Sequence, residues 1–109
     1  MKLAIAADGD NVSEHFGQCA GYVIFTIEDG KVTDRHAIDS PGHAPGVLPA
    51  LLADLGAGVV IAGGMGPKAV DLFCQHGIEV YVGISGDVDE VSEQFIRGEL
   101  QAGSNVCHH

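Results

Sequence analysis

The chain has 109 residues and a mass of 11.3 kDa, the usual size of one domain, which argues against a two-domain enzyme that closes over a cleft. Apolar residues make up 46% of the chain and charged residues 18%, so a buried core is expected and disorder is not. The net charge is −10 with no basic cluster, which argues against binding to nucleic acid or to an anionic membrane surface.

The first half of the chain predicts three strands. Residues 2–7 form a short apolar run that predicts a buried strand, and the run ends at Asp8. Residues 22–27 are all β-branched or aromatic, and Asp29-Gly30 behind them is a strong hairpin signal. Residues 32–38 alternate polar with apolar side chains, so one face of this third strand is expected to be wet, as suits an edge strand.

A loop, a helix and a central strand follow. Residues 40–46 contain two prolines and two glycines, which predicts a loop. From residue 47 to residue 55 apolar side chains recur at helical spacing, and Gly56 ends the predicted helix. Residues 59–62 are all apolar, which predicts a strand in the middle of the sheet.

The rest of the chain predicts a helix, a strand and a last helix. Residues 63–67 form a glycine-rich turn, in which Pro67 is well placed as the first residue of a helix that Gly77 ends. Residues 78–84 predict another apolar strand. Residues 87–97 have the pattern of an acidic amphipathic helix with one apolar face turned inward.

The predicted order is βββαβαβα, which indicates an α/β fold with a five-stranded mixed sheet. Hairpins make the first three strands antiparallel, and helical crossovers make the last two parallel to the first, so the simplest strand order is 3-2-1-4-5. The first and fourth strands are then neighbours from which the chain leaves in different directions, and such a switch point is a common ligand site. Four loops meet at that edge of the sheet: residues 8–19, 39–45, 63–67 and 85–87.

The N-terminus and the cysteines indicate where the protein works. The first ten residues are too short for a signal-peptide core, and no apolar run approaches the ~18 residues of a membrane helix, so we expect a cytoplasmic protein. The three cysteines are an odd number in a chain with an adequate core, which favours free thiols or metal ligands over a disulfide framework.

Imidazole and thiol side chains gather in the loops of the predicted edge. His15 and Cys19 lie four residues apart in the loop after the first strand, and His43 lies in the loop after the third. These groups bind borderline and soft metals and metal clusters. An exposed loop histidine is the alternative for each imidazole, including His36 on the third strand, but the convergence favours a metal site with His15 and His43.

The chain ends in Cys-His-His at residues 107–109, a second ligand-like group. It follows a helix that runs to the opposite edge, but nine residues beyond Leu100 reach up to ~30 Å when extended, against ~17 Å for an eleven-residue helix. The tail can therefore return to the site, and a frayed terminus is the alternative. We expect a single domain, residues 1–109, with a core over residues 1–99 and a flexible tail over residues 100–109.

The glycine-rich turn after the fourth strand has the features of an anion cradle. It presents backbone N–H groups at a helix N-terminus, with Gly64, Met65 and Gly66 beside the cation of Lys68. A tight turn that needs small residues is the alternative. Together with Ala69 the glycines match a dinucleotide-binding spacing, but weakly, because the turn follows the fourth strand and a proline removes one donor. A nucleotide or a phosphorylated metabolite is therefore an alternative ligand.

Two enzymatic interpretations have little support. Asp8, Asp10 and Glu14 suggest a two-metal nuclease, but the fourth strand supplies no partner carboxylate and the net charge opposes the substrate. No serine stands out with His and Asp partners, which disfavours nucleophilic hydrolysis. Cys74 lies within a predicted helix beside Phe73 and is expected to be a structural thiol, not a ligand.

Two motifs together resemble the dinitrogenase iron–molybdenum cofactor family, which includes NifX- and NafY-type proteins and the C-terminal domain of some NifB proteins. They are SEHFG at residues 13–17 and VIAGGMGP at residues 60–67, and the resemblance runs from Lys2 to about Gly98. It implies a ribonuclease H-like fold and a protein that binds or carries iron–sulfur-based cofactors and is not a hydrolase. It also implies a cofactor-binding role for His15.

The short stand-alone members of this family add to the expected site. His43 resembles a histidine of those members, which often also end in a cysteine and histidines like Cys107, His108 and His109. A nitrogenase role does not follow from the resemblance, because many of these members look like general cluster-handling proteins.

These features predict a non-enzymatic binding or carrier protein for an iron–sulfur or iron–molybdenum-type cluster, used in storage or in transfer to a recipient metalloprotein. A nucleotide- or phosphometabolite-binding protein and a protein–protein adaptor are the alternatives. The residues expected to hold the anionic cluster without coordinating its metal are Gly64, Met65, Gly66 and Lys68. The expected metal ligands are His15, Cys19, His43, Cys107 and His108.

Overall fold

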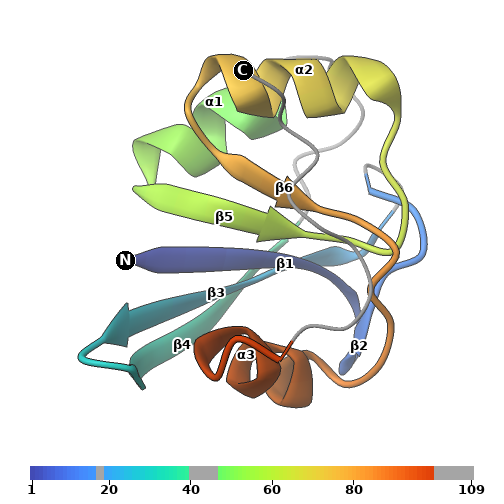
Figure 1. Ribbon diagram of the computed structural model, residues 1–109. Coiled ribbons are helices and arrows are strands. Elements are labelled where there is room, and N and C mark those ends of the chain that lie inside the picture. Colours follow the sequence, from blue (N-terminus) through green and yellow to red (C-terminus); the bar gives the residue numbers. More distant parts are fainter. Residues whose placement is uncertain (17–18, 40–46, 100–109) are drawn as a thin grey trace.

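The computed structural model describes residues 1–16, 19–39 and 47–99. Its sheet lies between two layers of helices, with α1 and α2 on one face and α3 on the other (Figure 1). The elements follow one another as β1 (Lys2–Asp8), β2 (Asn11–Val12), β3 (Gly21–Glu28), β4 (Lys31–Asp39), α1 (Val47–Asp54), β5 (Ala57–Ile61), α2 (Pro67–Gln75), β6 (Glu79–Tyr81) and α3 (Val88–Ile96).

The sheet has the predicted strand order, β4-β3-β1-β5-β6. β1 pairs with β3 and β3 pairs with β4 antiparallel, whereas β1 pairs with β5 and β5 with β6 in parallel. The prediction of five strands was wrong, because the two-residue strand β2 adds a sixth that pairs antiparallel with the end of β1. Two residues are too few to show an alternating pattern, so the sequence suggested only a turn there.

The predicted hairpin and edge strand are confirmed, with one difference. Asp29 and Gly30 have φ of 52° and 76°, which is the positive-φ pair of a tight hairpin turn. β4 is the edge strand, but its residues from Lys31 to Ala37 are exposed on both faces of the sheet, and not on one as expected. Arg35 lies above the Phe25 ring and forms an ion pair with Asp89 of α3 at 2.8 Å.

The last two helices begin and end close to the predicted positions. Pro67 is the first residue of α2, and Gly77 beyond its end has φ of 75°. The carboxylate of Asp87 caps α3 by accepting hydrogen bonds from the amides of two residues in its first turn. β6 is shorter than predicted, because after Tyr81 the chain turns at Gly83, which has φ of 77°.

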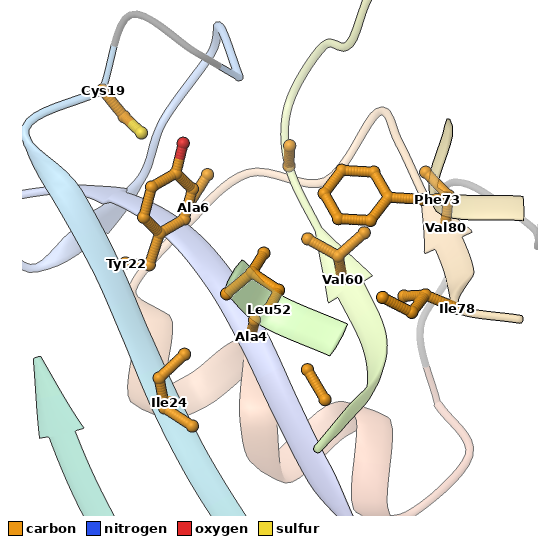
Figure 2. Packing of buried hydrophobic residues seen from close by; sticks show 12 residues of the cluster. Ala4, Ala6, Cys19, Tyr22, Ile24, Leu52, Val60, Phe73, Ile78 and Val80 are labelled. Atoms are coloured by element: carbon orange, nitrogen blue, oxygen red, sulfur yellow. The ribbon is translucent and has the colours of Figure 1, made fainter. Parts of the chain in front are cut away.

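The core has two layers, one on each face of the sheet. Between the sheet and the helices α1 and α2, side chains such as Tyr22, Leu52 and Phe73 are fully buried, and Figure 2 shows this cluster. Under α3 a second cluster includes Phe25 and Ile61. Burying a large apolar side chain stabilises a fold by roughly 1.5–3 kcal/mol, so these layers hold the strands in register. Within the part of the chain that the structure describes, no helix is long and apolar enough to span a membrane.

Candidate functional site

The loops that follow β1, β5 and β6 meet at one edge of the sheet, as predicted. The Val12 amide donates to the Gly86 carbonyl at 2.8 Å, which joins the first loop to the third. The Gly83 amide donates to the Gly63 carbonyl at 2.9 Å, which joins the third loop to the second. β4 ends at the same edge, because Asp39 pairs with Gly21 beside the end of β1. The edge is therefore one connected surface at the switch point between β1 and β5.

The two sequence motifs touch each other at this edge. The Gly63 amide donates to the Ser13 carbonyl, and the Phe16 amide donates to the Gly64 carbonyl, both at 2.8 Å. A Cβ atom on Gly63 would lie 2.8 Å from Glu14 Cα and from Ser13 O, and one on Gly64 would lie 2.8 Å from Glu14 O. The glycines are thus needed for a close approach of two backbones. Sequence reasoning missed this role, because nothing in the sequence shows which loop lies against the glycines.

His15 is presented to solvent by a loop that is fixed on both sides. The Ser13 hydroxyl hydrogen-bonds the amide and the carbonyl of His15, each at 3.2 Å. On the other side the Phe16 ring packs against Phe73 and Tyr22, with ring centroids 5.2 and 5.5 Å apart. His15 itself is exposed, and its imidazole makes no hydrogen bond or ion pair with the residues described. An exposed imidazole on a fixed backbone is available to a metal.

Cys19 lies in the same loop but faces the core. It is a free thiol, it is 6% exposed, and it belongs to the buried cluster with Tyr22 (Figure 2). Asp8 holds the loop beside it, because its carboxylate accepts a hydrogen bond from the Ala20 amide at 2.7 Å. A metal reaches the Cys19 sulfur only if this segment moves outward, so His15 is the more accessible donor of the pair.

Cys19 is therefore expected to react slowly with a thiol reagent while the protein is folded. Its modification by iodoacetamide should be at least ~10-fold faster in denaturant than in buffer, because the thiol must be uncovered first. Cys19 is the single cysteine of its tryptic peptide, residues 3–31, so mass spectrometry reports its modification separately from that of the other two cysteines. Equal rates for Cys19 in both conditions would contradict its burial.

The glycine turn before α2 offers free donors next to His15. Gly66 is the N-cap of α2, with φ −69° and ψ 155°, and no side chain caps the helix there. Among the residues described, the amides of Gly64, Met65 and Gly66 donate no hydrogen bond. Lys68 is exposed and has no ion-pair partner in the described ranges, whereas Met65 is half-buried against the core. Free amides, a helix N-terminus and a cation together attract an anion.

The remaining predicted ligands fall outside this geometry. His43, Cys107 and His108 lie outside the described residues. His36 lies on β4, exposed, 3.3 Å from Asp34. Within residues 1–16, 19–39 and 47–99, no group of three or more His, Cys, Asp or Glu side chains is arranged to hold a metal ion, which includes the acidic residues considered for a nuclease. Cys74 is half-buried in α2 and is not a free thiol, contrary to the expectation of unbonded cysteines.

Comparisons with known proteins cover nearly the whole chain. The family model for dinitrogenase iron-molybdenum cofactor matches residues 1–98. The protein MJ0580 of Methanocaldococcus jannaschii is 34% identical over 106 residues, which are 93% of this chain and 90% of that protein. The crystal structure of PH0822 matches with a TM-score of 0.88 and 35% identity over 94% of each chain. The apo form of the orange protein from Desulfovibrio gigas matches with a TM-score of 0.77 and 26% identity over 95% of this chain and 93% of that one.

Proposed function

The chain belongs to the dinitrogenase iron-molybdenum cofactor family, and we propose that it is a non-enzymatic carrier, which binds an anionic iron–sulfur or iron–molybdenum-type cluster at this sheet edge and passes it to a recipient metalloprotein. The observation that carries the proposal is the position of His15, exposed on a fixed loop whose backbone is bonded to Gly63 and Gly64. In the same turn, the amides of Gly64, Met65 and Gly66 donate to no described residue.

The donor groups that the structure describes at this edge suit a cluster better than a closed mononuclear site. A closed mononuclear site needs three or four protein ligands, and the described residues offer no such group. A cluster brings inorganic sulfide as its own ligand, so one imidazole and several hydrogen-bond donors are enough to hold it. Few protein ligands and an open face also suit a carrier, because the cargo must be released.

Each residue of the proposed site has a separate role. His15 coordinates a metal of the cluster, and the amides of Gly64, Met65 and Gly66 donate to its anionic surface, with Lys68 supplying charge. Cys19 joins the coordination only after its segment moves outward. The ligands proposed from the segments outside the described residues are His43, Cys107 and His108. The core over residues 1–99 and the flexible tail over residues 100–109 remain proposals as well.

We propose that the fold is ribonuclease H-like, which the antiparallel β4-β3-β1 half followed by the parallel β5 and β6 supports. We also propose that the protein works in the cytoplasm, a compartment in which Cys19 stays a free thiol. The alternative ligand, a nucleotide or a phosphorylated metabolite, gains no support from the family match.

Anaerobic reconstitution tests the function. The apo protein is incubated with iron and sulfide, with and without molybdate, then desalted and analysed for metal and by absorption spectroscopy. We expect a stoichiometric, coloured complex that transfers its cluster to an apo-ferredoxin in the presence of a chelator. No bound metal in any of these conditions would contradict the proposal, and protection from thermal unfolding by a panel of nucleotides would favour the alternative ligand.

Lys68 is expected to contribute charge to the cluster site. Replacing Lys68 with glutamine should weaken cluster retention by about 3- to 10-fold, because one cation is lost beside the α2 N-terminus. The effect should shrink at high salt, since the side chain is exposed. The rate at which bathophenanthroline removes the iron measures retention. Lys31→Gln is the matched control, because Lys31 is also exposed but lies at the hairpin away from this edge, and an equal effect of both changes would contradict a local role.

A further inference from the structure

Two polar residues are buried among those that the structure describes, and one of them lies in the candidate site. Ser13 is 3% exposed and precedes His15 by two positions, whereas Ser92 is 2% exposed within α3. The hydroxyl of Ser92 donates to the Asp89 carbonyl at 2.7 Å, an ordinary bond to the preceding helical turn. Ser13 does not lie in a helix, so its buried hydroxyl must have a hydrogen-bond partner of another kind.

The backbone of Ser13 is fixed without help from its side chain. Its amide donates to the Ala6 carbonyl at 2.8 Å, and its carbonyl accepts from the Gly63 amide at 2.8 Å. These bonds attach residue 13 to the end of β1 and to the turn after β5. Loss of the hydroxyl alone therefore leaves the loop docked on the sheet edge.

The hydroxyl of Ser13 acts on His15 and on no other described residue. Its oxygen accepts from the His15 amide and donates to the His15 carbonyl, each at 3.2 Å. These two bonds hold the peptide groups on both sides of His15, and the second group is also held by the Phe16 amide, which donates to the Gly64 carbonyl. Without the hydroxyl, the His15 amide loses its described hydrogen-bond partner, whereas the peptide group between His15 and Phe16 is still held by the bond to the Gly64 carbonyl. The peptide group before His15 can then rotate while the one after it stays anchored.

We propose that the Ser13 hydroxyl is a positioning group that holds the His15 backbone in the orientation in which its imidazole meets the cluster. This inference rests on the proposed function, in which His15 is a metal ligand. Groups that orient a ligand typically change metal affinity by about 10- to 100-fold when they are removed, because a misdirected ligand must be reordered on binding. Ser13 itself touches no metal.

Hydrogen exchange of the apo protein tests the positioning step without any cluster. In Ser13→Ala the His15 amide should exchange at least ~10-fold faster than in the wild type, while the Phe16 amide, bonded to Gly64, keeps its rate. Ser92→Ala is the matched control, since it removes an equally buried serine hydroxyl far from His15 along the chain, and it should leave both amides unchanged. An unchanged His15 amide in Ser13→Ala would overturn the inference.

Cluster retention after reconstitution with iron and sulfide tests the consequence. Ser13→Ala should lose iron to bathophenanthroline about 10-fold faster than the wild type and with an altered absorption spectrum, whereas Ser13→Thr, which keeps the hydroxyl, should restore both. Retention equal to the wild type in Ser13→Ala, or equal losses in Ser13→Ala and Ser92→Ala, would overturn the positioning role. A wild-type protein that takes up no cluster would overturn the proposed function instead, and the exchange result would still decide how the hydroxyl acts on His15.

Discussion

Replacing His15 with alanine is expected to lower the affinity for the iron–sulfur cluster by about 100-fold or more, which corresponds to about 2.8 kcal/mol. His15 is the exposed imidazole of the described loops at this edge, and the exposed carboxylates beside it, such as Glu14, are harder donors that suit an iron–sulfur cluster less well. The fold should be unaffected, because His15 is exposed and its imidazole makes no hydrogen bond or ion pair with the described residues. Iron and sulfide analysis after anaerobic reconstitution and desalting measures the loss.

Two other exposed histidines serve as matched controls for this change. His36 lies on the edge strand β4 and His76 at the end of α2, and both are exposed. Alanine at either position removes an imidazole without touching the glycine turn, so cluster retention should equal that of the wild type. A His15→Ala protein that keeps its full complement of metal, or a comparable loss in His36→Ala, would show that the cluster lies elsewhere.

The strand order could be predicted because each connection in this chain has one simple geometry. Asp29-Gly30 requires an antiparallel hairpin, and a helical crossover between apolar strands requires a parallel pair on the same sheet. From these two rules the switch point between β1 and β5 follows, and with it the edge where the loops meet. The location of the candidate site could therefore be predicted from local sequence signals alone.

The internal structure of the site could not be predicted in the same way. The burial of Cys19 depends on the orientation of its side chain in the loop, and the spacing between Cys19 and His15 does not determine that orientation. The contact of Gly63 and Gly64 with residues 13–16 joins positions about fifty apart through backbone atoms, so no side-chain pattern records it. The sequence suggested a role in anion binding for these glycines, and Gly63 and Gly64 also hold the histidine loop.

The negative charge of the chain explains why a cluster site needs a local cation and hydrogen-bond donors beside its metal ligand. A protein of net charge −10 repels an anionic cluster at long range, and the repulsion must be reversed locally for binding to occur. The amides of Gly64, Met65 and Gly66 donate to no described residue and lie in the turn that is bonded to the loop of His15, and Lys68 follows in the first turn of α2. Attraction and coordination therefore act at the same place. The long-range repulsion between the protein and the cluster also favours release of the cluster to a recipient that offers more ligands.

Replacing Gly63 with alanine is expected to destabilise the fold by about 2–4 kcal/mol, the second large effect that the structure predicts. The added Cβ would lie 2.8 Å from Glu14 Cα and from Ser13 O, and neither backbone atom can move without breaking the bond between the Gly63 amide and Ser13 O. The melting temperature should fall by roughly 10 °C or more. Cluster retention should fall with it, since the loop that presents His15 loses its support.

Gly58→Ala is the control that separates close contact from the general effect of adding a methyl group. Gly58 lies five positions before Gly63, within β5, and a Cβ there would meet nothing within 4 Å. Alanine should therefore change the unfolding free energy by less than about 1 kcal/mol, with a small gain possible from the stiffer unfolded chain. Equal melting temperatures for Gly63→Ala and Gly58→Ala would contradict the close contact between residues 13–16 and the glycine turn.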